Sequence, residues 1–239
     1  LDVGSNDIGP DGANALEALC LARASLTVLN LEGNEIGSEG ARSLAMALEN
    51  NAVLTSVTLL GNQFNDDTVS MLLELKKNKP TLTTLCGLKA DQTEANFAGW
   101  GLSAQDAKLL APEVAGGASL TSLDVGWNTI TGDGAWELAT VVLSKETLQS
   151  FCHIPLKELR ENRLTELNLK EKGIGVVGAL VLAELLTVSA SLTQLDLSRN
   201  RLGPEGAKAL APGLVRASLT KLNLSLNYIR LEDATALID

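Results

Sequence analysis

The sequence predicts an α/β solenoid, in which repeated strand–turn–helix units stack so that parallel strands line one face and helices cover the other. Two observations support this. Leucines recur at a fixed period: Leu26, Leu54 and Leu82 are each 28 residues apart, and Leu192 and Leu219 are 27 apart. Each leucine cluster is also followed by a glycine-containing turn and an apolar stripe of helical spacing. We therefore expect one elongated domain over residues 1–239.

One unit is clearest between residues 191 and 211. Leu192, Leu195 and Leu197 follow the pattern L-x-x-L-x-L, which predicts a short half-buried strand. The turn at 203–206 then places a proline and a glutamate where the first turn of a helix accepts them. Alanines and leucines at helical spacing follow, so each unit is expected to read as strand, tight turn and helix.

The units N-E-I-G-S-E-G-A-R-S-L-A (Asn34 to Ala45) and N-R-L-G-P-E-G-A-K-A-L-A (Asn200 to Ala211) resemble the ribonuclease-inhibitor-type leucine-rich repeat. That family includes the sensor arrays of NOD-like receptors and the GTPase-activating protein of Ran. The resemblance implies a right-handed horseshoe of about eight or nine units, with a parallel inner β-sheet and outer α-helices. It also implies that the asparagine of each unit bonds backbone groups of neighbouring turns.

Two segments depart from the repeat, near 82–93 and 148–163. The first holds either a short extra strand at Leu82 to Leu88 or a bulged loop, before a regular strand at Glu94 to Leu102 and a helix at Ser103 to Ala115. The second allows one helical turn at Leu156 to Glu161 before the next regular strand. The repeat asparagine is replaced by Trp100 and Lys172 in the units that follow them, which predicts altered packing there.

The charge and the cysteines of the chain limit the kinds of partner and the cellular compartment that we expect. A net charge of −10 argues against nucleic acid or an anionic membrane surface, and it favours a basic protein partner. No apolar run is long enough for membrane insertion. Cys20, Cys86 and Cys152 show no metal-ligand spacing and are expected to be free thiols, which favours a reducing intracellular compartment. Neither end carries the polar cap that a solenoid needs, so we expect a segment of a longer protein.

No catalytic, cofactor or metal site is predicted. Gly173 to Gly178 matches G-x-G-x-x-G, but Gly175 and Gly178 occupy positions where other units also carry glycine, so the repeat explains them. The pair Cys152-His153 is expected on a strand, where neighbouring side chains point to opposite faces and form no dyad. His153 would take an inward leucine position.

Binding is expected on the concave face or on exposed aromatic residues. The residues between the strand leucines face the concave side: Val28, Asn30, Glu32, Ser56, Thr58, Leu60, Ser122, Asp124, Gly126, Glu166, Asn168, Lys170, Gln194, Asp196, Ser198, Lys221, Asn223 and Ser225. Glu166 and Lys170 are the candidate contacts among them, and Arg199 follows at the exit of its strand.

Tryptophans suggest two further surfaces. Trp100 and Trp127 lie on adjacent units at one rim, where they form either an interface hot spot or a plug for the irregular segment. Trp136 and Leu180 take solvent-facing positions on their helices, which suggests either a convex contact surface or a patch covered by residues 148–163.

These patterns predict a non-enzymatic protein–protein interaction module, a recognition or scaffolding array without a cofactor. One alternative is a structural subunit built permanently into a larger complex, which the uncapped ends and Trp136 would suit. The other, implied only by the family resemblance, is a GTPase-activating protein of the Ran-activator type.

Overall fold

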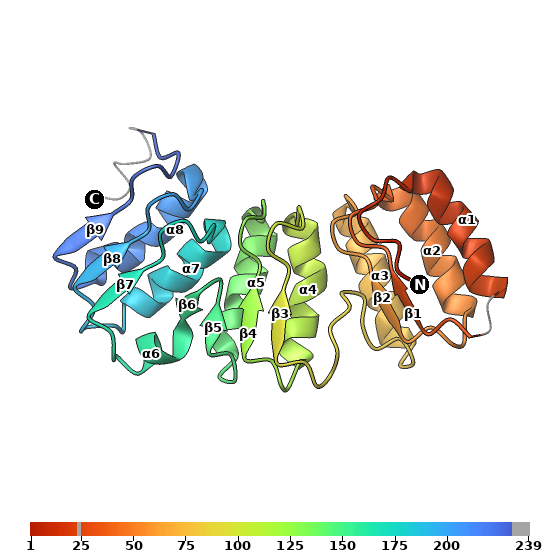
Figure 1. Cartoon of the computed structure of the whole chain (residues 1–239), viewed down its shortest axis with the longest axis horizontal. Coiled ribbons are helices and arrows are strands. Elements are labelled where there is room, and N and C mark those ends of the chain that lie inside the picture. The colour runs from red at the N-terminus through yellow and green to blue at the C-terminus, as the bar shows by residue number, and fades with distance from the viewer. Residues whose placement is uncertain (23–24, 231–239) are drawn as a thin grey trace.

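The computed structural model describes residues 1–22 and 25–230, which form a curved row of strand–helix units (Figure 1). The elements, in chain order, are α1 (Gly9–Ala22), β1 (Val28–Asn30), α2 (Gly37–Asn50), β2 (Ser56–Thr58), α3 (Asp66–Asn78), β3 (Glu94–Asn96), α4 (Ala104–Gly116), β4 (Ser122–Asp124), α5 (Gly132–Ser144), β5 (Ser150–Phe151), β6 (Ile154–Pro155), α6 (Leu156–Arg160), β7 (Glu166–Asn168), α7 (Gly175–Leu186), β8 (Gln194–Asp196), α8 (Gly203–Arg216) and β9 (Lys221–Asn223). The alternation of strands and helices confirms the predicted solenoid.

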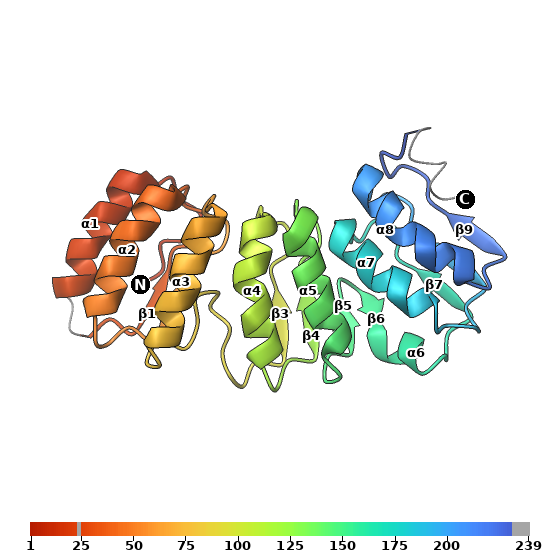
Figure 2. The same ribbon diagram turned by 180° about the vertical axis from the view of Figure 1, so that it is seen from behind.

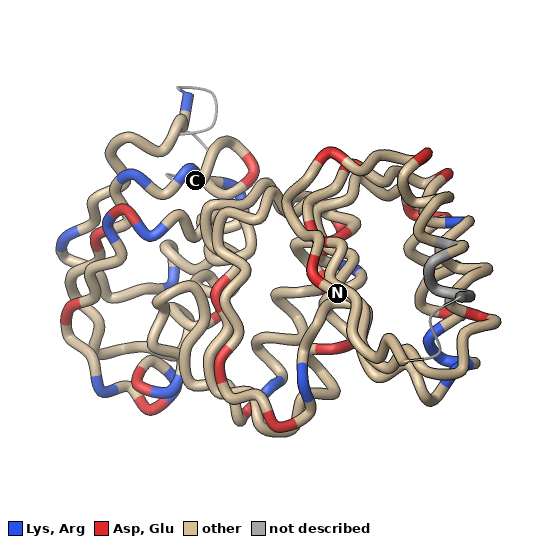
Figure 3. The backbone as a smooth tube through the Cα atoms, turned by 45° about the vertical axis from the view of Figure 1, so that its right-hand side comes forward, with Lys and Arg blue, Asp and Glu red and all other residues tan. Residues whose placement is uncertain are grey.

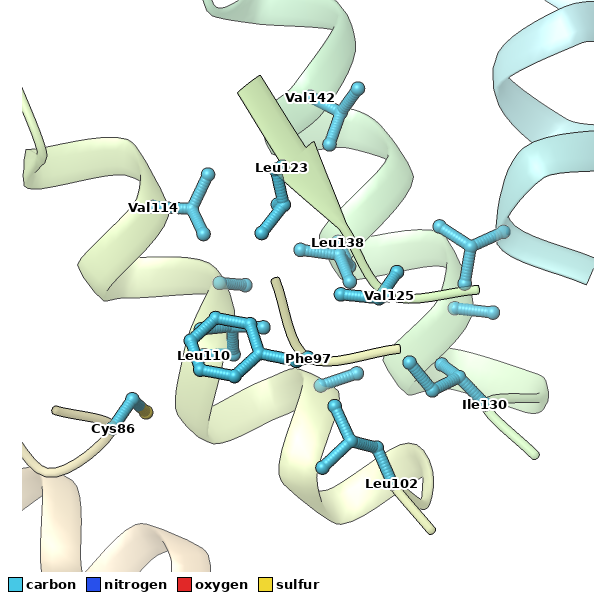
Figure 4. Packing of buried hydrophobic residues seen from close by; sticks show 14 of the residues in the cluster. Cys86, Phe97, Leu102, Leu110, Val114, Leu123, Val125, Ile130, Leu138 and Val142 are labelled. Carbon is cyan, nitrogen blue, oxygen red and sulfur yellow. The ribbon is translucent and has the colours of Figure 1, made fainter. Parts of the chain in front are cut away.

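The long helices stand side by side on one face of the row, and the strands lie on the other (Figure 2). Within a unit, the strand leucines point inward: Leu192, Leu195 and Leu197 are all at most 2% exposed. Helix residues meet them from the other side, so one continuous core runs along the row. Figure 4 shows this packing in the central units, where Phe97 lies against Leu110 of α4, and Cys86 lies at the edge of the group. None of the helices that the structure describes is long and apolar enough to span a bilayer.

A ladder of buried asparagines connects the loops that follow the strands. The side chain of Asn62 accepts from the backbone N–H of Asn34 at 3.0 Å, and it donates to the carbonyls of Leu31 and Leu59. Asn200 makes the same contacts with Lys172, Leu169 and Leu197. Each asparagine thus bonds the unit before it as well as its own, as the family resemblance implies.

The inner sheet is not continuous. It is divided into three sheets, β1-β2, β3-β4-β5-β6 and β7-β8-β9, and the two interruptions fall in the irregular segments. The prediction of one parallel inner sheet is therefore corrected at two places. Within each sheet the full strands pair in parallel, with a step of one repeat, as in Val28 with Ser56. The breaks lie before the two units that carry Trp100 and Lys172 in place of asparagine, where altered packing was predicted.

At the first break, residues 82–88 form a partial rung. Leu82 and Leu85 are buried like strand leucines, and single bridges join Thr84 to Ser56 and Cys86 to Thr58. No full strand forms there, so the segment is intermediate between the two alternatives predicted from the sequence, a short extra strand and a bulged loop. It also covers the concave side: Thr58 and Leu60, expected to be exposed there, are 8% and 0% exposed.

Glu113 of α4 replaces the missing strand partner. Its carboxylate accepts from the backbone N–H of Leu85 at 2.6 Å, from the Thr84 hydroxyl at 2.5 Å and from the Lys76 ammonium at 2.7 Å. The glutamate side chain is 3% exposed. A buried carboxylate is tolerated only when it is paired and hydrogen-bonded, and here both conditions hold.

A second carboxylate joins the same two units. Asp106 occupies the helix position that Gly40, Gly134 and Gly206 hold in other units, and it completes a capping box with Ser103. Its other oxygen accepts from the backbone N–H of Gly61 at 2.7 Å. At Gly134 a β-carbon would lie 2.0 Å from the Ala104 carbonyl oxygen, so glycine allows α4 and α5 to approach closely. At the boundary between α3 and α4 this position holds Asp106, and these two helices stand further apart than α4 and α5 do (Figure 2).

The second break contains a tight hairpin. Ser150 pairs with Pro155 and Phe151 with Ile154 in antiparallel fashion, with Cys152 and His153 as the two turn residues. Both have positive φ, 46° and 64°, as a type I′ turn requires. The prediction that this pair lies on a strand with His153 inward was wrong, because the chain reverses there. Cys152 is fully buried, and His153 is exposed with Nε2 3.2 Å from Asp124.

After the hairpin, α6 forms at Leu156–Arg160, which confirms the predicted helical turn. The Arg160 guanidinium donates to the carbonyls of Val142, Leu143 and Leu148, near the end of α5. The last carbonyls of a helix lack intrahelical partners, so this arginine stabilises the C-terminus of α5.

The described cysteines are free thiols, as predicted. Cys86 and Cys152 are both buried. Burial raises the pKa of each thiol well above its usual range, and a nearby carboxylate, Glu113 or Asp124, adds to the effect. The side chain of Cys20 lies outside the part of the chain that the structure describes.

Candidate interaction surface

Large side chains project from the loops that follow strands β4, β7, β8 and β9. We call this set the rim surface: Trp127, Glu171, Arg199, Arg201, Leu226 and Tyr228. These six side chains line one open hollow of about 580 Å³. All six residues are exposed.

Every rim residue has a left-handed backbone, with φ between 56° and 60°. In earlier units the positions equivalent to Trp127 and Arg199 are Gly33, Gly61 and Gly99, at φ of 61° to 74°. A side chain with a β-carbon costs about 1 kcal/mol or more in this conformation, and bulky residues there are rare. Ser5, Glu35 and Gln63 of the earlier units have the same backbone, so the conformation belongs to the repeat, and what distinguishes the rim surface is the size of the side chains that it carries there.

Trp127 is held rigidly although it is 40% exposed. Its backbone N–H donates to the carbonyl of Gly173 at 2.8 Å, which joins the units on either side of the second break. The ring lies on Gly173, where a β-carbon would come within 2.4 Å of it. The Arg201 guanidinium stacks over the ring at 5.2 Å, a cation–π contact. A rigid aromatic residue loses little entropy on binding, which suits an interface anchor.

Arg199 pairs with Glu171 of the preceding regular unit, at 3.0 Å between Nη1 and Oε1. Both side chains remain about half exposed, so the pair contributes little to folding. Tyr228, the single tyrosine of the chain, is 75% exposed at the far end of the hollow.

The cost of the left-handed backbone at Arg199 can be measured directly. We expect Arg199→Gly to be more stable than Arg199→Ala by about 1 kcal/mol, because both variants lose the guanidinium and only alanine keeps a strained β-carbon. Urea unfolding followed by circular dichroism measures the difference. Equal stabilities would show that the rim backbone is unstrained.

On the concave sheet beside the rim, Glu166 and Lys170 are exposed as predicted. Glu166 accepts a hydrogen bond from the Gln194 amide at 2.5 Å. Asp196 is more enclosed: desolvation raises the pKa of its carboxyl, but hydrogen bonds from Ser198 and Asn223 outweigh this, so the pKa lies below its usual value. Acidic and amide groups on this face are therefore largely bonded to one another.

Trp100 does not join Trp127 in one cluster. Its ring packs edge-on against Phe97 of its own unit, with the centroids 5.0 Å apart, and it lies against the core. The ring of Trp127 instead contacts Gly173 and Arg201, which belong to later units. The geometry of Trp100 therefore matches a plug beside the irregular segment, while Trp127 remains a candidate contact.

On the convex face, Trp136 is 60% exposed but Leu180 is only 4% exposed, so the expectation of an exposed leucine was wrong. Leu180 is buried because α7 is packed between α5 and α8, and ten of its twelve residues are buried. Trp136 and Leu180 do line a common groove of about 700 Å³, together with Arg160, Pro212 and Arg216. The segment 148–163 reaches this groove through Arg160 and leaves the tryptophan exposed.

Sequence reasoning missed four members of the rim surface: Glu171, Arg201, Leu226 and Tyr228. A signal was present: in the same columns other units carry glycine, as at Gly99, Gly101 and Gly173. A column that alternates between glycine and large side chains indicates a left-handed backbone that some units occupy at a cost.

The glycines of G-x-G-x-x-G follow the repeat in the structure as well. Gly175 has φ of 57°, close to 62° at Gly37 and 61° at Gly203, and Gly178 lies against Ile174 as Gly40 lies against Ile36. Over residues 1–22 and 25–230, no three His, Cys, Asp or Glu side chains are grouped as metal ligands would be.

Comparison with known protein families gives one finding. A family model described as a leucine-rich repeat matches residues 1–16, 24–45, 118–139 and 188–211. Each matched segment spans a strand position and the first part of the helix that follows it. Proteins built from such repeats generally mediate protein–protein interaction and are typically non-enzymatic.

Proposed function

We propose that this leucine-rich repeat protein recognises another protein through the rim surface and the adjoining concave sheet of its last units, without catalysis. The observation that carries the proposal is the occupation of six left-handed positions by exposed tryptophan, arginine, glutamate, leucine and tyrosine. Tryptophan, tyrosine and arginine are the residues that dominate binding hot spots.

We propose further that the units are of the ribonuclease-inhibitor type. Two features support this assignment: the period of 27 to 28 residues, and the full helices on the convex side, which have 14 residues in α2 and in α8. The intracellular compartment favoured by the free thiols suits this assignment.

Cross-linking mass spectrometry on the native protein in its own extract tests the proposal. We expect a partner cross-linked to Lys170, Lys172 and Lys221, which lie on or beside the strands of the last units. The paired variant Trp127→Ala with Arg201→Ala should remove these cross-links and leave circular dichroism unchanged. Cross-links on Lys170 and Lys221 that persist in the variant would contradict a role for the rim.

A second candidate is a structural subunit of a larger assembly, which Trp136 favours. The ring is exposed beside a groove formed by α5, α7 and α8, on the face opposite the strands. Cross-links at Lys108, Lys145 and Lys208 to several proteins in fixed stoichiometry would support this function, and Trp136→Ala should then release the protein from its complex.

A further inference from the structure

We propose that the rim surface binds an acidic segment of the partner, although the chain as a whole is acidic. The inference rests on the proposed function and specifies the partner's chemistry. It reverses the expectation of a basic partner that follows from the net charge of −10.

Cations beside the rim are available to a ligand, and Lys221 lies further along the concave sheet, in a hollow that it lines with Glu166 and Asp196. Among the residues that the structure describes, Lys170, Lys172, Arg201 and Lys221 form no ion pair, and Arg201 is held in place over Trp127. From residue 164 to 230 the chain holds eight lysines and arginines against five acidic residues, and Glu232, Asp233 and Asp239 follow outside the described residues. Figure 3 shows lysines and arginines interspersed with acidic residues on these units, and acidic residues along the upper edge of the N-terminal units.

The acidic residues of the same surface are already engaged. Glu166 accepts from Gln194, Glu171 pairs with Arg199, and Asp196 accepts from Ser198 and Asn223. Their carboxylates therefore offer less to an incoming cation. Lys170 lies close enough to Asp196 to help lower the pKa of that carboxyl, whereas the Arg201 guanidinium rests on an uncharged ring. Charge complementarity selects carboxylates as the ligand.

Distance separates this surface from the acidic units. Glu32 and Glu35 belong to the unit of β1, and at least five rungs lie between it and the unit of β8. At about 4.8 Å per rung this is roughly 24 Å. The Debye length is about 8 Å at physiological ionic strength, so local charge decides what binds at the rim.

Trp127 and Tyr228 add apolar selectivity. Both are exposed in the hollow that Arg199 and Arg201 also line. A carboxylate that pairs with Arg201 brings neighbouring side chains over these rings. We therefore infer that the bound segment combines acidic residues with aromatic or large apolar ones.

Selection from random dodecapeptides displayed on phage tests the inference on the intact chain. We expect enriched peptides rich in aspartate and glutamate with an aromatic or leucine residue. Synthetic copies of them should bind at least about tenfold more weakly to a variant carrying both Lys170→Glu and Arg201→Glu, because like charges would then face each other. Their affinity should also fall as salt is added.

A matched variant controls for net charge. Lys157→Glu together with Lys208→Glu changes the charge equally, at exposed positions on α6 and α8. It should bind the peptides like the original chain, and both variants should keep their circular dichroism and melting temperature. Equal weakening by the two variants would overturn the inference.

The remaining outcomes separate this inference from the proposed function. Enriched peptides that are basic or uncharged, and that still require Trp127, would overturn the acidic partner and retain the rim as a binding surface. If no peptide is enriched and no partner is cross-linked at the rim, both proposals fail.

Discussion

Replacing Glu113 by alanine is expected to lower the free energy of unfolding by about 3 kcal/mol or more. The substitution leaves the N–H of Leu85 and the Thr84 hydroxyl without their buried acceptor, and it leaves the Lys76 ammonium unpaired. Urea unfolding followed by circular dichroism measures the loss. Amide hydrogen exchange should locate it, with faster exchange at Leu85 and Cys86.

An exposed pair on either side of Lys76 in the same helix provides the control. Glu74 lies 3.5 Å from Lys77, and both side chains are more than half exposed. Glu74→Ala should change stability by no more than about 0.5 kcal/mol. If Glu113→Ala costs as little, the carboxylate does not hold the first break in the sheet.

Replacing Asn200 by alanine is expected to cost about 3 kcal/mol. Its fully buried side chain accepts from the N–H groups of Lys172 and Ile174 and donates to the carbonyls of Leu169, Leu197 and Ser198. Alanine leaves all five groups without this partner in the interior. Because two units share these bonds, the amides of Lys172 and Ile174 should lose exchange protection together.

The first unit supplies a matched substitution. Asn6 holds the same repeat position but is exposed, and its side chain donates only to the carbonyls of Val3 and Gly4. Water can replace those bonds, so Asn6→Ala should cost about 1 kcal/mol or less. Similar losses at Asn6 and Asn200 would mean that bonding between units contributes nothing.

Much of each unit was readable from the sequence because the interactions that form it are local. The helix α4 and the short helical turn of α6 lie within one residue of the predicted bounds. Leucine spacing identified the buried residue of strands such as β1, β4, β7 and β8, whereas Leu222 of β9 is 39% exposed. The loss of asparagine at Trp100 and Lys172 indicated where the units would pack differently.

The carboxylates at the first break had a signal that the leucine pattern does not use. Glu113 stands where other helices carry Ala47, Val141 and Gly213, and Asp106 stands where they carry glycine. A charged residue in a small or apolar column indicates a special contact. The backbone N–H groups that these two carboxylates bind, those of Leu85 and Gly61, lie too far away in the sequence for the leucine pattern to identify them.

The sequence by itself determined the unit, its period, its buried face and the positions of both irregular segments, because each follows from residues within about one repeat. Only the tertiary structure decided that the sheet divides in three, that Leu180 is buried while Trp136 is exposed, and that Trp127 reaches Gly173 and Arg201. These outcomes depend on how units pack across an irregular segment. That packing is set by contacts between residues tens of positions apart, which no local pattern encodes.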